Sequence, residues 1–487
     1  MTGSFDCRNT HTLERIPFRG AFFAAAYSIQ LPSSPEISGE LLFFPIGKER
    51  TELMTHEEYM GRALTLALRG TGRVSPNPLV GAVIVKDGRV IGEGWHAYYG
   101  GLHAERAALQ DCAVRGEDPA GADIYVTLEP CCHHGKQPPC TDALIQAGIR
   151  RVFTGAGDPN PKVAGKGIRI LRDHGIEVTE HVLEKECLRQ NEVFFHYITT
   201  GLPFVCLKYA MTLDGKTACF TGESRWVTGE AARRHVHETR NRLSAIMAGV
   251  GTVIADDPLL TCRLTAEPAS APESDCPPAE GRNPVRIICD SALRTPLTAK
   301  VVATASETPT ILATCCGDES RQAPYLAAGC RILLCRDAAA GDVAAAEDPA
   351  AGTPAAAQAP CGIRPRVDLM DLMRKLGAEG IDSVLLEGGG TLAWSALESG
   401  IVNKVQAYIA PKLFGGAESK TPVEGRGFPA PAEAPMLENV TYMQLGRDLL
   451  VEGYLPQSRP SSGSTCATQT EASAPTGPEI QGERRTE

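Results

Sequence analysis

The sequence predicts an α/β protein with two domains, and three observations support that prediction. Short apolar runs with the character of buried strands recur along the chain, for example at residues 123–128 and 383–387. Helix-like stretches follow them, and strands that alternate with helices are typical of layered α/β folds. The chain has 487 residues, more than one hydrophobic core usually serves, and its hydrophobic fraction of 43% is ordinary for a globular protein.

The first domain is expected to be a three-layer α/β/α sandwich. Residues 57–70 carry apolar side chains at helical spacing, and glycines end this helix. Apolar runs at 81–85 and 89–94 flank Lys86-Asp87-Gly88, which predicts a hairpin with an Asp-Gly turn. A helix at 103–109, a strand at 123–128, a helix at 141–145 and a strand at 152–155 then follow. We expect the starts of these two helices to lie beside the ends of the strands.

The second domain is expected after a connection at 188–201. Its strands are predicted at 203–208, 245–248, 285–289, 310–313 and 383–387, with helical stretches between several of them. Two stretches look like flexible insertions, because 267–282 is rich in Pro, Glu and Ala and 338–361 consists almost entirely of Ala, Pro, Gly and Asp. The predicted organisation is an N-terminal extension at 1–53, a first domain at 54–190, a second domain at 200–456, and a disordered tail at 457–487.

Charge and cysteine content narrow the class of protein. The net charge of −10 argues against a nucleic-acid-binding protein, which would normally carry a basic surface. The 17 cysteines are odd in number and irregular in spacing, which favours a reducing cytoplasm over a secreted disulfide scaffold. No apolar run is long enough for a membrane span. Residues 20–29 resemble a short signal-peptide core, but Asp6 and Glu14 precede them, and we expect no signal peptide and no membrane partner.

The most informative motif combines His103-Ala104-Glu105 with Cys131 and Cys140. Histidine and cysteine are zinc ligands, and three protein ligands leave the fourth tetrahedral position open for water. Glu105 follows the histidine by two residues and is placed to carry protons to and from that water. This pattern is the signature of zinc-dependent deamination of a nucleobase-like ring, although the two cysteines are farther apart here than in its short form. A Gly- and Pro-containing loop spans the longer interval.

A closed structural zinc site is the alternative interpretation of this motif. In such a site Cys132, His133 or His134 would supply a fourth protein ligand. That arrangement would leave Glu105 without a role, and Cys-rich structural sites usually contain two short Cys pairs. A catalytic zinc site is therefore the better interpretation.

A second candidate site follows the strand at 383–387. Glu387 is followed by three glycines and Thr391, and a helix-like stretch begins at 393. Glycines let the backbone approach a phosphate, and a helix N-terminus offers free N–H groups. The motif differs from G-x-G-x-x-G, so we predict no Rossmann domain. A plain loop is the alternative interpretation of the glycines.

These motifs resemble those of the bifunctional deaminase–reductase family of bacterial riboflavin biosynthesis, and the resemblance runs from about Met54 to about Leu455. The first half contributes the stretches 75–81 (SPNPLVG), 103–105 (HAE), 127–131 (TLEPC) through Cys140, and 158–161 (DPNP). The second half contributes Lys208, 213–215 (LDG), 222–226 (GESRW), 255–261 (ADDPLLT) with Arg263, and 387–391 (EGGGT). Both sets occur in the family's order. The resemblance implies a cytidine-deaminase-like first domain and a dihydrofolate-reductase-like second domain.

The resemblance also implies two consecutive reactions and two cofactors. The first is zinc-dependent hydrolytic deamination of 2,5-diamino-6-(5-phosphoribosylamino)pyrimidin-4(3H)-one. The second is the NADPH-dependent reduction of the ribosyl group of 5-amino-6-(5-phosphoribosylamino)uracil to ribityl. The expected partner is thus a small phosphorylated pyrimidine, and the preference for NADPH over NADH is inherited from the family. The sequence leaves homo-oligomer formation open.

Roles for individual residues follow from the motif and from the resemblance. The expected zinc ligands are His103, Cys131 and Cys140, with Glu105 as the acid and base. By resemblance, NADPH contacts Ala210, Trp226, Thr252, Asp256, Gly389, Gly390, Thr391, Leu392, Ala393, Trp394 and Ser395. The same comparison places Ser224, Arg240, Leu260, Arg263 and Glu387 at the substrate of the second reaction. Arginine suits a ribose phosphate because its fork binds two oxygens.

We hypothesise separate roles for two further residues. Lys208 is expected near the sugar, where it would polarise the ring or the ring-opened imine. Asn77 would hydrogen-bond the pyrimidine edge, or it is simply a turn-forming residue between two prolines.

Two rival functions explain less of the chain. A nucleoside or RNA deaminase with an accessory domain leaves the second half idle. A zinc-stabilised binding module with a degenerate reductase domain is disfavoured by the intact Glu105 and the intact 387–391 stretch.

Overall fold

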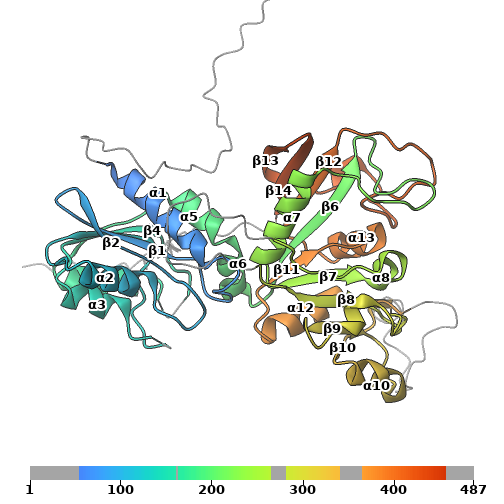
Figure 1. Ribbon diagram of the computed structural model, residues 1–487, viewed down its shortest axis with the longest axis horizontal. Coiled ribbons are helices and arrows are strands. Elements are labelled where there is room, and N and C mark those ends of the chain that lie inside the picture. Colours follow the sequence, from blue (N-terminus) through green and yellow to red (C-terminus); the bar gives the residue numbers. More distant parts are fainter. Residues whose placement is uncertain (1–53, 136, 161–162, 265–280, 340–364, 457–487) are drawn as a thin grey trace, which may run out of the picture. The chain divides into compact units, whose positions relative to one another are not determined.

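The computed structural model describes residues 54–135, 137–160, 163–264, 281–339 and 365–456. The predicted N-terminal extension and tail, and nearly all of both predicted inserts, lie outside these residues. The described part forms two separate sheets, one of five strands and one of nine (Figure 1). Within it, no helix combines the length and the apolar character that crossing a bilayer would require.

The first sheet has the strand order β2-β1-β3-β4-β5. Its strands are β1 (Gly81–Lys86), β2 (Arg89–Trp95), β3 (Asp123–Leu128), β4 (Arg151–Ala156) and β5 (Glu177–Thr179). Its helices are α1 (His56–Ala67), α2 (Ala104–Val114), α3 (Cys140–Gln146), α4 (Lys166–Asp173), α5 (Glu184–Gln190) and α6 (Glu192–Thr200), with a 3-10 turn η1 (Leu68–Gly70). β1 is antiparallel to β2 and β3, whereas β3, β4 and β5 are parallel.

Helices cover both faces of this sheet. α1 and α5 lie on one face, and α2 and α3 lie on the other (Figure 1). All six residues of β3 are buried, as expected for a central strand covered on two sides. The three-layer prediction for the first domain is therefore confirmed.

Local sequence explains how several of these elements begin and turn. Thr55 and Glu58 form a capping box at the start of α1. Asp87 and Gly88 have φ values of 52° and 74°, which is the conformation of the predicted two-residue hairpin turn. His103 is the N-cap of α2, so the predicted zinc histidine lies at the helix start.

The second sheet has the order β10-β9-β8-β7-β11-β6-β12-β14-β13. Its strands are β6 (Phe204–Thr212), β7 (Ala245–Gly249), β8 (Val285–Cys289), β9 (Thr310–Thr314), β10 (Arg331–Leu334), β11 (Ser383–Leu386), β12 (Lys404–Ala410), β13 (Glu438–Leu445) and β14 (Asp448–Tyr454). Its helices are α7 (Glu230–Arg242), α8 (Val250–Asp256), α9 (Lys300–Ala303), α10 (Glu319–Ala327), α12 (Leu369–Ala378) and α13 (Gly390–Glu398), with a 3-10 turn η2 (Pro431–Glu433). The seven strands from β10 to β12 are parallel, and β14 and β13 continue the sheet antiparallel.

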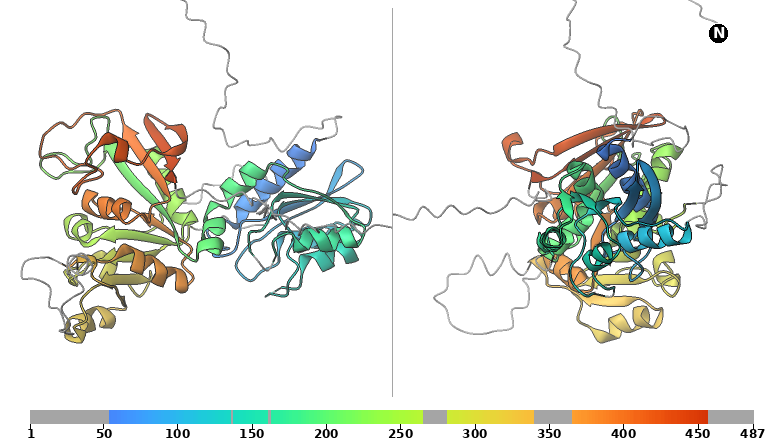
Figure 2. Two further views of the ribbon diagram at one scale, coloured as in Figure 1. Left: turned by 180° about the vertical axis from the view of Figure 1, so that it is seen from behind. Right: turned by 90° about the vertical axis from the view of Figure 1, so that its left-hand side faces the viewer.

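Apolar side chains on both faces of this sheet join separate cores. Val205 and Leu207 pack with the apolar faces of α12 and α13. Phe204 and Cys206, which alternate with them along β6, face the opposite side. Helices lie on both faces, and Figure 2 shows this layering from behind. The α/β prediction is confirmed for this domain as well.

Two features of the fold differ from the sequence expectations. The segment predicted as a connection consists of two helices, α5 and α6, and Phe194 and Phe195 of α6 pack into the core of the first domain. The closing hairpin of β13 and β14 was not predicted. No residue of β13 is fully buried, because β13 is an edge strand, and buried residues of β14 alternate irregularly with more exposed ones.

Candidate active sites

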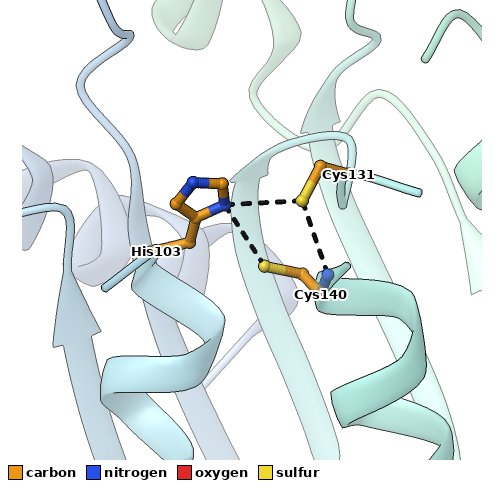
Figure 3. A group of neighbouring side chains, drawn as sticks. All are labelled: His103, Cys131 and Cys140. Atoms are coloured by element: carbon orange, nitrogen blue, oxygen red, sulfur yellow. Dashed lines mark hydrogen bonds between the residues drawn. The ribbon is translucent and has the colours of Figure 1, made fainter. Parts of the chain in front are cut away.

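Three predicted metal ligands come together at the starts of two helices. His103 caps α2, Cys131 follows β3, and Cys140 opens α3. The two sulfur atoms each lie 3.4 Å from Nδ1 of His103, and Figure 3 shows this nitrogen turned toward both of them. The backbone N–H of Cys140, at the N-terminus of α3, donates to Sγ of Cys131 at 3.4 Å.

The spacing of these donor atoms fits a zinc ion. Zn–S bonds of about 2.3 Å and Zn–N bonds of about 2.0–2.1 Å in a tetrahedron require roughly 3.5 Å between sulfur and nitrogen. All three ligand atoms lie within 4.8 Å of one another. The hydrogen bond with Cys140, together with His103, lowers the pKa of the Cys131 thiol to about 4, so a thiolate is already favoured here.

The closed four-ligand alternative finds no support. Among the described residues, the ligand group contains His103, Cys131 and Cys140 and no fourth His, Cys, Asp or Glu. Cys132, His133 and His134 are all described, and none belongs to it. The site thus has the three-ligand composition of a catalytic zinc centre.

Glu105 lies in the first turn of α2 and lines the same cavity as His103 and Cys131. Its side chain is buried, with 4% of the residue exposed. Burial, and the charge of the Cys131 thiolate beside it, raise the pKa of the Glu105 carboxyl to about 7. A carboxyl in this range exchanges protons readily near neutral pH.

The cavity over the metal ligands has a volume of about 310 Å³, which suits a small ligand. Its wall is formed by the start of α2, the 76–80 turn, the 131–137 loop and α6. Asn77 also lines it. The site is therefore a pocket with an acid–base group and metal ligands at one end.

A neighbouring histidine fixes the orientation of Asn77. His96 is buried, and its Nδ1 lies 2.9 Å from the carbonyl oxygen of Leu102, so Nδ1 carries the proton. Its Nε2 therefore accepts from Nδ2 of Asn77 at 3.1 Å. Because the amide nitrogen is used in this way, Asn77 presents its side-chain oxygen as an acceptor for a ligand.

Sequence reasoning gave no role to several residues that line the cavity. His96, Asp158 and Asn160 are among them. Burial raises the pKa of Asp158 to about 6. The available signal was position, because Asp158 follows the carboxyl end of a parallel strand, where ligands bind in open α/β sheets.

In the second domain, Lys208, Arg240 and Glu387 form a partly buried ion cluster. Nε and Nη2 of Arg240 donate to the two carboxylate oxygens of Glu387 at 2.7 and 3.0 Å, and Nζ of Lys208 lies 3.4 Å from the same carboxylate. Burial alone would raise the pKa of Glu387, but the two cations outweigh it and hold that pKa well below its usual range. The remaining donor of Arg240, Nη1, binds the carbonyl oxygen of Thr261 at 2.9 Å.

Arg263 differs from Arg240 because its guanidinium has no partner among the residues that the structure describes. It is exposed, and no described residue accepts a hydrogen bond or forms an ion pair with that group. Leu260, three residues earlier, has a φ of 51° and a side chain buried in the core. Any contact of Leu260 with a ligand must therefore come from its backbone.

The predicted phosphate loop forms the start of a helix. Gly389 is the N-cap of α13, which begins at Gly390. Thr391 hydrogen-bonds Glu424, whereas Ala393 and Trp394 are buried, and Trp394 packs against Phe428 at 5.1 Å between ring centroids. Of the predicted cofactor contacts, Gly389, Thr391, Leu392 and Ser395 are thus the ones at the more open side of the helix start, whereas Gly390 is buried.

The remaining predicted residues lie on other elements of the second domain. Ala210 belongs to β6, Thr252 and Asp256 belong to α8, and Ser224 and Trp226 lie in the loop before α7. Trp226 is exposed, and the guanidinium of Arg233 stacks 4.6 Å from its ring centroid. These residues surround the carboxyl ends of β6, β7 and β11, the usual ligand-binding edge of a parallel sheet.

Comparison with known proteins gives a family for each domain. Residues 53–156 match the cytidine and deoxycytidylate deaminase zinc-binding region, and residues 203–451 match the RibD C-terminal domain. The chain is 46% identical to the riboflavin biosynthesis protein RibD of Actinobacillus pleuropneumoniae, over 84% of this chain and 98% of that protein. It is 38% identical to RibD of Escherichia coli, over 81% and 98% of the two chains.

Solved structures give the same result. The crystal structure of a diaminohydroxyphosphoribosylaminopyrimidine deaminase/5-amino-6-(5-phosphoribosylamino)uracil reductase from Thermotoga maritima matches with a TM-score of 0.66 and 38% identity, covering 82% of this chain and 98% of that one. RibD of Acinetobacter baumannii matches with a TM-score of 0.66 and 33% identity, covering 83% and 99%.

Fold, sites and relatives together define a zinc-dependent deaminase joined to an NADPH-using reductase. Such two-site enzymes act on a small phosphorylated pyrimidine. The chain belongs to the RibD family and is a bifunctional deaminase–reductase of riboflavin biosynthesis.

Proposed function

We propose that this chain converts 2,5-diamino-6-(5-phosphoribosylamino)pyrimidin-4(3H)-one in two steps. The first domain hydrolyses the ring amine and releases ammonia, and the second reduces the ribosyl group of 5-amino-6-(5-phosphoribosylamino)uracil to ribityl. The relative from Thermotoga maritima is named for both activities. The observation that carries the proposal is the cavity of about 310 Å³ that is lined by His103, Cys131 and Glu105, with Cys140 completing the ligand group.

For the deamination, His103, Cys131 and Cys140 would hold the zinc, which when bound supplies an activated water at neutral pH. Glu105 accepts a proton from the attacking water and later donates it to the departing nitrogen, which leaves as ammonia. The side-chain oxygen of Asn77 accepts a hydrogen bond from the pyrimidine edge. Balance is kept, because the amine at the ring carbon is replaced by oxygen and one water is consumed.

For the reduction, NADPH when bound supplies the hydride, and the protein supplies position and charge. We assign the cofactor phosphates to the start of α13, from Gly389 to Ser395. Further cofactor contacts are assigned to Ala210, Trp226, Thr252 and Asp256. Thr252 and Gly389 face each other closely enough to share a ligand, because a Cβ on Gly389 would meet Oγ1 of Thr252 at 3.9 Å.

We assign the substrate of the reduction to the residues around the ion cluster of Lys208, Arg240 and Glu387. Arg263 binds the ribose phosphate, since its guanidinium is exposed while that of Arg240 is occupied by Glu387. Lys208, held at 3.4 Å from Glu387, polarises the sugar or the ring-opened imine. Ser224 and the backbone of Leu260 complete this set.

The wider assignments rest on composition and on the fold. We propose domain bounds of 54–190 and 200–456, with α6 occupying the interval between them. We propose a reducing, cytoplasmic location, supported by 13 free cysteines among the described residues. The net charge of −10 supports a protein without nucleic-acid partners.

A coupled assay tests the proposal. The purified chain is given the pyrimidinone phosphate, and ammonia release and NADPH absorbance are followed together. Replacing Glu105 by Gln is expected to slow deamination by about 10²–10⁴-fold, because the acid–base group is lost while the ligands remain. Zinc content and NADPH oxidation with the deaminated substrate should stay unchanged.

The matched control is Glu117→Gln, the same chemical change at a surface ion pair with Arg89. Near wild-type deamination by Glu105→Gln would show that the acid–base assignment is wrong. Ammonia release from cytidine or RNA, but not from the pyrimidinone phosphate, would instead favour the nucleoside or RNA deaminase alternative.

A further inference from the structure

Helix α7 forms hydrogen bonds with three consecutive residues of the loop that carries Arg263. Nη1 of Arg240 donates to the carbonyl oxygen of Thr261 at 2.9 Å. Sγ of Cys262 donates to the carbonyl oxygen of His237 at 3.4 Å. The backbone N–H of Arg263 donates to Nδ1 of the His237 side chain at 3.1 Å. The position of this loop therefore depends on side chains and backbone of α7.

The contact with His237 requires one protonation state of the imidazole. A ring nitrogen that accepts a hydrogen bond must carry a lone pair, so the proton lies on Nε2. Burial and the nearby cations of Arg240, Arg263 and Lys208 lower the pKa of His237 to about 4. The carboxylate of Glu387 opposes this shift. His237 is therefore neutral near pH 7, and the acceptor is present.

The two arginines near this histidine have different partners. Arg240 directs its donors to Glu387 and Thr261, so it is part of the protein framework. Arg263 has no side-chain partner among the described residues, and its direction is set only through its backbone. Holding the backbone of an arginine in place favours its contact with a phosphate, because only the side-chain torsions then remain to be ordered on binding.

We propose that His237 is a positioning residue of the reductase site, whose Nδ1 fixes the backbone of Arg263 so that the guanidinium meets the phosphate of the substrate. This proposal rests on the assignment of Arg263 to the substrate phosphate made above. We assign His237 no contact with the reacting sugar carbon or with the cofactor. Its effect is on the affinity for phosphorylated substrate.

Two substitutions in the full-length chain distinguish the effect of the hydrogen-bond acceptor from the effect of side-chain size. In His237→Asn the side-chain oxygen is as many bonds from Cβ as Nδ1 is, so an acceptor remains. In His237→Leu a side chain of similar size has no acceptor. His237→Met serves as a second variant without an acceptor, should leucine disturb the packing of α7.

The readout is steady-state reduction of 5-amino-6-(5-phosphoribosylamino)uracil and of its phosphate-free nucleoside. We expect His237→Leu to raise the KM for the phosphorylated substrate about tenfold, with kcat and the KM for NADPH within about twofold. The kcat/KM for the nucleoside should not change. His237→Asn should keep the KM within about threefold of wild type, and deamination by the first domain reports that each variant is intact.

A double-mutant cycle with Arg263→Met tests the coupling. In the Arg263→Met background, His237→Leu should add no further loss, because the group it positions is gone. An unchanged KM in His237→Leu, or equal losses with both substrates, would overturn the role of His237 while leaving the proposed function intact. If Arg263→Met itself leaves the KM unchanged, the phosphate assignment is wrong and the role of His237 is overturned with it.

Discussion

Gly94→Ala is predicted to disturb the zinc site from outside it. Gly94 lies in β2, where α2 crosses the sheet at close range. A Cβ added at Gly94 would lie 2.3 Å from the backbone nitrogen of Ala108 and 2.4 Å from the carbonyl oxygen of Ala104. Both atoms belong to the backbone of α2, and His103 is the N-cap of that helix.

The size of the effect follows from these distances. Ordinary contact begins at 3.4 Å, so α2 must move away from the sheet by about 1 Å, and overpacking of this kind costs about 1–3 kcal/mol. We expect the upper end of that range, because neither colliding atom can rotate out of the way. Metal sites hold their ligand distances within about 0.2 Å. A shift of the His103 end of α2 by even half of this movement should therefore weaken zinc binding.

The assay compares zinc content and the two activities in one preparation. Gly94→Ala should contain less than half of the wild-type zinc by elemental analysis, and its deamination should fall by about 10²-fold. Reduction of the deaminated substrate should continue, since the second domain is unchanged. Gly157→Ala is the matched control, because an added Cβ there has no atom within 4 Å. Stoichiometric zinc and normal deamination in Gly94→Ala would refute the reasoning.

Two further predictions concern the metal and the stability of the second domain. Cys131→Ala should lose bound zinc, and retention of one zinc per chain in elemental analysis would contradict the ligand role of Cys131. Arg286 is fully buried and donates five hydrogen bonds, three of them to the carbonyl oxygens of residues 259, 304 and 308. Arg286→Met should lower the free energy of unfolding in urea by about 3–5 kcal/mol, whereas Arg374→Met, at an exposed position of α12, should change it by less than about 0.5 kcal/mol; equal effects would disprove the role of burial.

Much of the chemistry was determined by sequence alone. The spacing of His103, Glu105, Cys131 and Cys140 predicted the metal, the open coordination place and the acid–base residue, because ligand identity is a property of side-chain type. Strand and helix patterns predicted the α/β class and the Asp-Gly hairpin, because these depend on residues close together in the chain. Such local features do not depend on how the helices and strands pack together.

The tertiary structure decided which side chains meet. Asn77 is oriented by His96, and Arg240 is occupied by Glu387, 147 residues further along the chain. Arg263 is exposed, and its backbone is held by His237. No sequence motif or periodicity predicts these pairings, because they arise where segments distant in sequence pack together. Their burial also sets the proton affinities of Glu105, Asp158 and His237, which depend on the surroundings of each group and not on its residue type.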